Sequence, residues 1–354
     1  MKVLITGICG FAGSSIARGL QDLESTIELS GIDNFSRPGS ELNRTALRNL
    51  GVPVHHADLR NASDVDALPA SDWLIDAAAN PSVLAGVSGV TSSRQLVEHN
   101  LAGTINLLEY CKRYRAGFIL LSTSRVYSIP LLSSLKVQES GEAYRPVAEQ
   151  DFPNGITTNG VAETYSTMPP VSLYGSTKIA AECLALEYGV DFDFPVWIDR
   201  CGVMAGAGQF GRPDQGIFTY WINAWLRNRP LKYIGFNHKG YQVRDCLHPR
   251  DLVSILSRQM DAPSGKNRIC NFGGSVINSM SLAQLSAWCT TRFGAREIGA
   301  DLSPRPFDLP WMVLDTRRAE KEWHWQVKTP LQRILEEIAE HAAKHPNWLE
   351  LSAP

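Results

Sequence analysis

Three glycines spaced three residues apart follow directly on the first apolar run of the chain. The run is Lys2–Thr6, and the glycines are Gly7, Gly10 and Gly13, after which apolar residues recur with helical spacing as far as Leu23. A strand, a glycine turn and a helix in this order bring backbone amides and a helix N-terminus close to a phosphate group. The pattern therefore predicts the first unit of a dinucleotide-binding sheet.

Strand and helix signals alternate through the first half of the chain. Apolar runs predict further strands at residues 27–33, 53–57, 73–77 and 117–122, and a helix is predicted at about 92–114. The last run is nearly all apolar, which is typical of parallel strands covered on both faces. We therefore expect an α/β fold built on a doubly wound parallel sheet of the Rossmann type.

The second half of the chain is less regular. Residues 128–172 are rich in Pro, Ser, Thr and Gly, and we expect a long excursion over the edge of the active site. A helix from Tyr174 and a strand at 194–200 complete a first domain that we place at residues 1–201. We expect residues 202–354 to form a smaller substrate-binding lobe, with some segments returning to the large domain. Its helices are predicted at about residues 216–228, 250–260, 282–293 and 330–345.

Composition and charge exclude several classes of protein. A net charge of -2 argues against a surface for nucleic acid or an anionic membrane. No stretch approaches the ~18 apolar residues of a membrane-spanning helix, and the first apolar run is too short for a signal peptide. The seven cysteines include no Cys-x-x-Cys pair. We therefore expect reduced thiols, no metal site and a cytoplasmic protein.

An acidic residue ends the second predicted strand. Asp33 follows the glycine turn by about 20 residues, where a carboxylate accepts from the adenosine ribose of a dinucleotide. It would repel a 2′-phosphate, so we expect NAD rather than NADP, although Arg37 is near enough in sequence to offset that charge. The residues expected around NAD are Gly7, Gly10, Phe11, Ala12, Gly13, Asp33, Asn34, Asp58, Leu59, Ala77, Ala78 and Lys178.

Tyr174 and Lys178 stand four residues apart at the predicted start of a helix. Residues at this spacing share one helix face, so the phenol and the ammonium point to the same place. A neighbouring lysine and a helix N-terminus both lower the pKa of a tyrosine from its usual value near ~10. The pair therefore predicts a general base, and Thr123 at the end of a strand would hydrogen-bond the same substrate hydroxyl.

The glycine turn, Thr123 and the Tyr174/Lys178 pair together resemble the extended short-chain dehydrogenase/reductase family of nucleotide-sugar enzymes. The resemblance covers nearly the whole chain, and Asn100 matches a structural position of the family. In the family's sugar dehydratases, the threonine is followed by Asp-Glu, an acid pair that eliminates water. The sequence here has Ser124 and Arg125 instead. The resemblance therefore implies an epimerase rather than a dehydratase.

Two later segments resemble the family's nucleotide-sugar motifs. In residues 244–251, Arg-Asp-x-x-His-x-x-Asp, the resemblance implies that Arg244 contacts the substrate diphosphate. In residues 305–309, it implies that Arg305 meets a phosphate and Asp308 the nucleotide ribose. A planar guanidinium is well suited to phosphate oxygens.

Four stretches resemble the subfamily that epimerises CDP-paratose to CDP-tyvelose: residues 33–37, 122–127, 209–216 and 242–248. The implied substrate-binding residues are Ser124, Gln209, Phe210, Gln215, Arg244, Arg305 and Asp308. The insertion between Thr123 and Tyr174 is longer than this subfamily leads us to expect, and Ser128 replaces its usual glycine. The base and the sugar therefore stay open.

The resemblance implies an NAD-dependent isomerase that inverts carbon 2 of a nucleotide-diphosphate sugar, with a CDP-sugar favoured, through a transient ketone. Two alternatives stay open: a 4-epimerase or reductase on the same fold, and a non-catalytic NAD-binding protein, which would usually lose the Tyr/Lys pair. The family also implies a homo-oligomer, in which the helices at 92–114 and 174–189 would pack against a second subunit. Aromatic residues at helical spacing are predicted to pack in the core: Phe218, Tyr220, Trp221 and Trp225.

Overall fold

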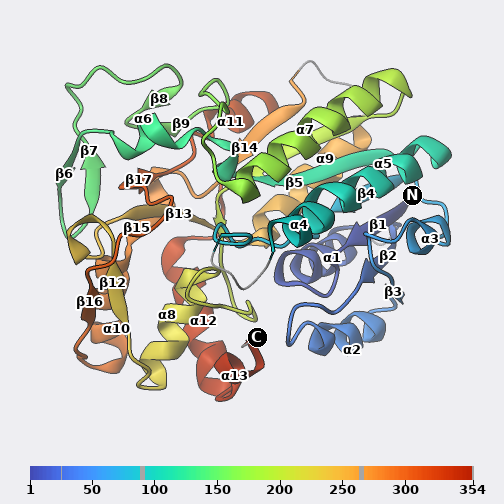
Figure 1. The fold of residues 1–354 in the computed structure, drawn as a ribbon. Helices are drawn as coiled ribbons and strands as arrows, with labels where there is room; N and C mark the ends of the chain where they lie inside the picture. The colour runs from blue at the N-terminus through green and yellow to red at the C-terminus, as the bar shows by residue number, and fades with distance from the viewer. Residues whose placement is uncertain (25, 88–91, 263–266, 353–354) are drawn as a thin grey trace.

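A parallel sheet runs through the larger part of the molecule (Figure 1). The computed structural model describes residues 1–24, 26–87, 92–262 and 267–352, and within them this sheet has seven strands in the order β14-β10-β5-β4-β1-β2-β3. Their bounds are β1 Lys2–Thr6, β2 Glu28–Asp33, β3 Val54–His56, β4 Trp73–Asp76, β5 Gly117–Thr123, β10 Val196–Cys201 and β14 Ile269–Phe272. Because β1 pairs with β2 on one side and β4 on the other, the strand order reverses at β1, where such sheets open a crevice.

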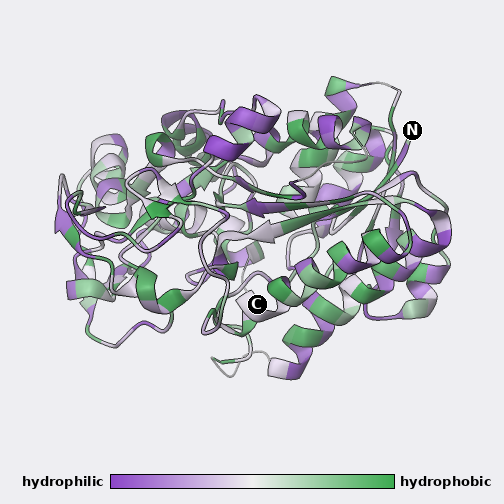
Figure 2. Ribbon diagram, turned by 90° about the horizontal axis from the view of Figure 1, so that it is seen from above, coloured by the Kyte–Doolittle hydropathy of each residue, from purple (hydrophilic) through white to green (hydrophobic). Residues whose placement is uncertain are grey.

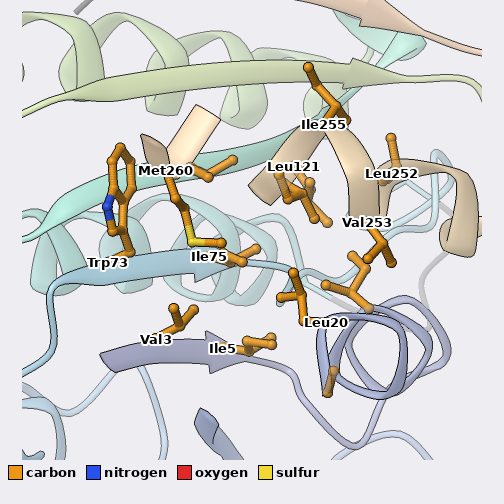
Figure 3. Close-up of a cluster of buried hydrophobic side chains, with 14 of the residues drawn as sticks. Val3, Ile5, Leu20, Trp73, Ile75, Leu121, Leu252, Val253, Ile255 and Met260 are labelled. Carbon is orange, nitrogen blue, oxygen red and sulfur yellow. The ribbon is translucent and has the colours of Figure 1, made fainter. Parts of the chain in front are cut away.

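Helices cover both faces of this sheet, as the prediction of a doubly wound sheet required. One face packs against α1 (Phe11–Leu23), α9 (Val253–Asp261) and α11 (Arg317–Trp323), and the other against α5 (Gly103–Tyr114) and α7 (Leu173–Asp191). Figure 3 shows the first of these interfaces, where side chains of β1 and β4 meet those of α1 and α9. The helices carry alternating hydrophobic and hydrophilic stretches in Figure 2, as amphipathic helices do.

The helix expected at 92–114 is interrupted. It consists of α4 (Ser93–Val97), a π-helical turn η1 (Glu98–Ala102) and α5. Within the π turn, the Asn100 side chain accepts from the backbone N–H of Asn80 at 2.8 Å and donates to its carbonyl at 3.1 Å. Asn100 therefore has the structural role that its sequence position implied. Two short helices between β2 and β4 were not predicted, α2 (Glu41–Asn49) and α3 (Ala62–Asp66).

A smaller mixed sheet lies beside the large one and is formed by β11, β13, β15 and β17. Their bounds are Val203–Met204, Val243–Leu247, Ser279–Ser281 and Trp311–Met312, and β12 (Lys232–Ile234) pairs separately with β16 (Gly299–Asp301). The helices of this lobe are α8 (Ile217–Leu226), α10 (Leu282–Phe293), α12 (Leu331–Lys344) and α13 (Trp348–Ser352). Phe218, Trp221 and Trp225 are each 2% exposed, which confirms their predicted packing in the core.

The excursion at 128–172 is folded. It contains α6 (Ile129–Ser133) and two hairpins, β6–β7 (Val137–Glu139, Tyr144–Pro146) and β8–β9 (Ile156–Thr157, Gly160–Val161). The backbone of Val161 bonds to Val313 and Asp315, so the excursion packs on the segment that follows β17. It therefore packs on the substrate lobe, and two of its residues, Ile129 and Pro170, line a pocket there.

The C-terminal half returns to the large sheet. Strand β14 is an edge strand of that sheet, and α9 and α11 cover one of its faces. The helices for which a subunit contact is predicted, α5 and α7, lie side by side over the opposite face (Figure 1). Among the described residues, the structure has no helix of the length and apolarity needed to span a membrane.

Candidate active site

A cavity of about 410 Å³, hereafter the cleft, lies at the C-terminal ends of β1, β2, β4, β5 and β10. The structure brings most of the predicted site residues together along its walls. These are Gly7, Gly10, Phe11, Ala12, Gly13, Asp33, Asn34, Asp58, Leu59, Ala77, Ala78, Thr123, Ser124, Tyr174, Gln209, Phe210, Gln215, Arg244 and Arg305. Lys178 is buried beside the cleft, and Asp308 lines an adjoining pocket that shares Arg305 with it.

The glycine turn leaves space that side chains would fill. Gly7 has a φ of +58°, in the left-handed region that favours glycine. A Cβ on Gly13 would lie 2.3 Å from the carbonyl oxygen of Gly7, and one on Gly7 would lie 2.9 Å from the Cα of Ala78. The start of α1 therefore approaches the ends of β1 and β4 as closely as backbone allows. This cradle fits the pyrophosphate of NAD, whose charge the helix N-terminus stabilises.

Asp33 is held by two backbone donors at the end of β2. The N–H groups of Cys9 and Phe35 donate to its two carboxylate oxygens at 2.9 and 2.8 Å. Burial raises the pKa of Asp33, while these bonds act in the opposite direction. The fixed carboxylate lines the cleft and fits the ribose-binding role predicted for it.

Asn34 and Asp58 form a second polar group on this side. Asn34 donates to Asp58 at 3.3 Å, and Asp58 pairs with Arg60 at 2.6 Å, which holds the pKa of Asp58 well below its usual range. Arg37, in contrast, donates to the carbonyl of Phe210 and to Oε1 of Gln215, the latter at 2.8 Å. Its guanidinium is thus engaged by the substrate lobe.

The predicted catalytic pair lies near the start of α7. The hydroxyl of Ser172 caps this helix by accepting from the backbone N–H of Gly175 at 3.1 Å. Tyr174 and Thr123 both line the cleft, so the end of β5 and the first turn of α7 place the two hydroxyls on one wall. The sequence predicted this arrangement from a hydroxyl at a strand end and a tyrosine at a helix start.

The prediction that the protein lowers the pKa of Tyr174 is wrong. Burial raises the pKa of Tyr174 to about 12, because the charged phenolate loses hydration. The opposing contributions come from hydrogen bonding to Thr123 and from the charge of Arg125, and Lys178 is not among them. Lys178 is only 2% exposed, and burial lowers its own pKa while Asp76 and Glu182 raise it.

Glu182 was not predicted from the sequence as a residue that supports the site. It lies four residues after Lys178 on the same face of α7, and its carboxylate pairs with Arg200 of β10 at 2.6 Å in a buried site. Ser122 of β5 donates to the same carboxylate. The i+4 spacing was the available signal, but only the neighbouring strands reveal that Glu182 fixes α7 against the sheet.

The substrate side of the cleft contains three arginines, Arg125, Arg244 and Arg305, hereafter the arginine cluster. Burial, followed by repulsion from the neighbouring arginines, lowers the pKa of Arg244 to about 9. Arg244 lies 3.7 Å from the carboxylate of Asp308, which also accepts from Gln242 at 3.0 Å. Asp308 is thus engaged within the protein, and its contact with a nucleotide ribose stays a prediction.

The loop at 209–216 contributes through contacts within the lobe. Gln209 donates to the carbonyl of Met204 at 2.8 Å and accepts from Thr219 at 2.9 Å. Phe210 stacks on Trp348 with ring centroids 5.1 Å apart. The backbone and side chains of the loop line the cleft, and their contact with a substrate stays a prediction.

Several lining residues carried no sequence signal that we used. They come from segments far apart in the chain: Arg60, His99, Val203, Met204, Met280, Ser281 and Leu282. Arg60 and His99 belong to the large domain, and the others reach the cleft because the small sheet is folded against the large one. Their spacing in the chain gives no hint of this.

Comparison with known proteins finds relatives over nearly the whole chain. Residues 3–273 match the model of the NAD dependent epimerase/dehydratase family. The chain is 33% identical to CDP-paratose 2-epimerase from Salmonella typhi, over 93% of this chain and 95% of that protein. It is 26% identical to UDP-glucuronate 4-epimerase 1 from Arabidopsis thaliana, over 75% of this chain and 56% of that protein.

A solved structure has the same architecture. It is a variant of UDP-glucuronic acid 4-epimerase from Bacillus cereus, in complex with UDP-4-deoxy-4-fluoro-glucuronic acid and NAD. The TM-score is 0.78 at 25% identity, with 97% of this chain and 99% of that chain covered. The fold and the cradle for a dinucleotide thus agree with proteins that bind NAD.

Proposed function

The chain belongs to the NAD dependent epimerase/dehydratase family, and we propose that it inverts carbon 2 of a CDP-linked sugar, as in the conversion of CDP-paratose to CDP-tyvelose. The protein is an NAD-dependent enzyme of nucleotide-sugar chemistry. The observation that carries the choice of reaction is the 33% identity, over 93% of the chain, with a protein named as a 2-epimerase. Ser124 and Arg125 support it, since a dehydratase of this family would have an acid pair in their place.

The chemistry divides between the cofactor and the protein. Bound NAD would supply the redox chemistry, which is a reversible transfer of a hydride from and to the sugar carbon. Tyr174 removes the proton of the sugar hydroxyl and gives it back after the ketone has presented its other face. Thr123 orients the reacting oxygen by hydrogen bonding, and Lys178 holds the ribose of the nicotinamide.

Proton removal needs more positive charge than the protein alone supplies to Tyr174. The pKa of about 12 means that the phenol is protonated at neutral pH in the surroundings that the chain provides. The positive charge of oxidised nicotinamide changes those surroundings in the direction of the phenolate. We therefore expect base catalysis to depend on bound NAD.

Inversion at carbon 4 is the second candidate. It is favoured by the similarity to UDP-glucuronate 4-epimerases in sequence and in structure. The same Tyr174 and Thr123 would serve either carbon, because the sugar's orientation in the cleft selects the carbon that faces the phenol. The two candidates therefore differ in how the sugar is held and not in the catalytic groups.

Isotopic labelling tests the choice of carbon. The purified enzyme is supplied with CDP-paratose carrying deuterium at carbon 2 or at carbon 4, and the product is analysed by mass spectrometry and NMR. We expect the rate to fall only with the carbon 2 label, and the label to stay at carbon 2 of the product. A rate change with the carbon 4 label would overturn the proposal in favour of a 4-epimerase, and transfer of label to added NAD would indicate a reductase.

A further inference from the structure

Arg125 is the one member of the arginine cluster that the chemistry above does not use. It follows the catalytic Thr123 by two residues and lines the cleft with Tyr174. The inference drawn from it rests on the proposed function, since it concerns which sugar carbon reaches the phenol.

The backbone of Arg125 is fixed at the reaction centre. Its N–H donates to the hydroxyl oxygen of Thr123 at 3.2 Å. Its carbonyl oxygen lies against Gly175 in the first turn of α7, where a Cβ would be only 2.4 Å from that oxygen. The backbone of Arg125 is thus held between β5, which supplies Thr123, and α7, which supplies Tyr174.

The guanidinium of Arg125 extends from there to the segment that carries Arg305. It donates to the carbonyl of Phe307 at 3.4 Å. Arg244, from β13, donates to the carbonyl of Leu309 at 2.9 Å. Three arginines from three separate elements therefore meet at residues 305–309, and Arg125 is the member whose backbone also bonds to the catalytic threonine.

The cluster has more positive than negative charge. The carboxylates that act on Arg125 and Arg244 are those of Asp308 and Asp245, and burial raises the pKa of Asp245 to about 7, so its charge is incomplete at neutral pH. Burial, followed by repulsion from Arg305, lowers the pKa of Arg125 to about 10. A bound diphosphate would supply the missing negative charge, and forked guanidinium groups suit its oxygens.

The covalent structure of a nucleotide sugar turns this arrangement into a choice of carbon. The diphosphate is bonded through oxygen to carbon 1 of the sugar, carbon 2 is the next ring atom, and carbon 4 lies across the ring. A cation that binds the sugar-linked phosphate from a position beside Thr123 holds carbon 1 close to the phenol. Carbon 2 is then the carbon within reach of Tyr174, and carbon 4 points away from it.

We propose that Arg125 binds the sugar-linked phosphate and thereby selects carbon 2 for oxidation. Arg125 is in this view a specificity-determining residue, in addition to the two arginines whose sequence motifs imply diphosphate binding. The competing account is that Arg125 only ties the end of β5 to residues 305–309 through its bond to Phe307.

The test compares Arg125→Gln and Arg125→Lys with Arg296→Gln. Arg296 is a matched control, because its guanidinium also bonds to backbone carbonyls, those of Ala224, Trp225 and Arg229. The probes are CDP and CMP, and UDP and UMP, whose affinities are measured by calorimetry on the NAD-loaded enzyme. Kinetics with CDP-paratose labelled at carbon 2 or carbon 4, the melting temperature and the bound NAD are recorded in parallel.

We expect Arg125→Gln to reduce the preference for the diphosphate over the monophosphate by about ten- to a hundredfold, the usual effect of losing a charged hydrogen bond. kcat/KM for carbon 2 should fall by a similar factor, Arg125→Lys should recover part of both, and Arg296→Gln should change neither. An Arg125→Gln enzyme that keeps its NAD and its full preference for the diphosphate would overturn the proposal. An equal loss of affinity for diphosphate and monophosphate together with a lower melting temperature would also overturn it. That result is expected if Arg125 only ties the end of β5 to residues 305–309.

The proposed function and this inference fail in different ways. If the wild-type enzyme oxidises carbon 4, the proposed function is wrong, and the choice of carbon assigned to Arg125 is wrong with it. If oxidation is at carbon 2 but Arg125→Gln leaves the diphosphate preference unchanged, the function stands and the assignment of Arg125 fails.

Discussion

The two halves of the cleft are built in different ways. The cofactor half is lined by the glycine turn and by the residues that end β2 and β4, all within the first 79 positions of the chain. The substrate half combines the end of β5 with positions near 209, 244, 281 and 305. The first is formed by segments close together in the chain, and the second by segments far apart in it.

The difference shows in the forces that hold each half. Gly13 lies against the backbone of Gly7, and Asp33 accepts from Cys9 and Phe35, so the cofactor half is fixed by short-range backbone contacts. In the substrate half, Arg244 reaches the carbonyl of Leu309 and the carboxylate of Asp308 across 65 and 64 positions of sequence. A change in the first should therefore act on NAD alone, and a change in the second should act on the nucleotide sugar.

The largest effect is expected for Tyr174→Phe, which should remove catalysis without changing binding in either half of the cleft. The variant keeps the ring and removes the proton acceptor, so we expect kcat to fall by roughly 10³-fold, within the range of acid–base catalysis. NAD content and CDP affinity should stay at wild-type values, because neither half of the cleft is altered. Steady-state kinetics and analysis of the released nucleotides measure these quantities.

Tyr188→Phe is the matched control, since Tyr188 lies on the same helix with its hydroxyl bonded to Glu109 at the surface. It should turn over at the wild-type rate. A Tyr174→Phe enzyme with near-normal activity would remove Tyr174 from the role of base.

Gly13→Ala should break the cofactor half alone. The residue lies inside α1, where alanine is otherwise favourable, but its Cβ would lie 2.3 Å from the Gly7 carbonyl oxygen. Displacing this backbone should weaken NAD binding by about tenfold or more, which corresponds to the cost of overpacking. Titration of the cofactor-free protein with NAD measures the loss, and calorimetry with CDP should detect none on the substrate side.

The control for this substitution is Gly299→Ala. It lies in an exposed strand, and the nearest atom to its Cβ would be Cγ of the flexible Lys232 side chain at 3.3 Å. NAD affinity should be unchanged in this variant. Unaltered NAD binding in Gly13→Ala would contradict the close approach that the structure shows.

A third prediction concerns stability, and it compares the two sheets. Burial raises the pKa of Asp199 in the large sheet and of Asp245 in the small sheet to about 7. The folded protein therefore keeps a proton on each carboxyl that the unfolded chain releases near its ordinary pKa of about 4. Stability should be highest at low pH within this window and should fall by up to about 1.4 kcal/mol per pH unit for each group as pH rises towards 7.

Asp199→Asn should remove the share of this dependence that belongs to the large sheet. Asn keeps the shape and stays neutral, and Asp199 has one oxygen without a hydrogen-bond partner among the described residues. Thermal unfolding of wild type and variant between pH 5 and pH 8 measures the difference. A variant whose midpoint falls with pH as steeply as that of wild type would show that Asp199 does not hold its proton.

The sequence predicted the cofactor half more fully than the substrate half. Most of the parallel strands and the helices of the doubly wound fold follow from apolar periodicity, since their signals are local. Arg244, Arg305 and Gln242 could be selected only by resemblance to a family, and Ser281 not at all, because nothing in its neighbourhood in the chain marks it. The pKa of Tyr174 was predicted with the wrong sign, because a spacing of four residues shows the nearby lysine but not the burial of the phenol.

By itself, the sequence determined the fold class, the dinucleotide cradle and the pairing of a tyrosine with a strand-end threonine. The first two depend on periodicities and turns between residues close in the chain, and the third on the rule that strand ends line the crevice of such a sheet. Only the tertiary structure decided that Arg125 joins Arg244 and Arg305, that Asp308 is already engaged, and that Arg37 faces the substrate lobe. Charge and burial at those positions come from segments that meet only when the small lobe folds against the large sheet.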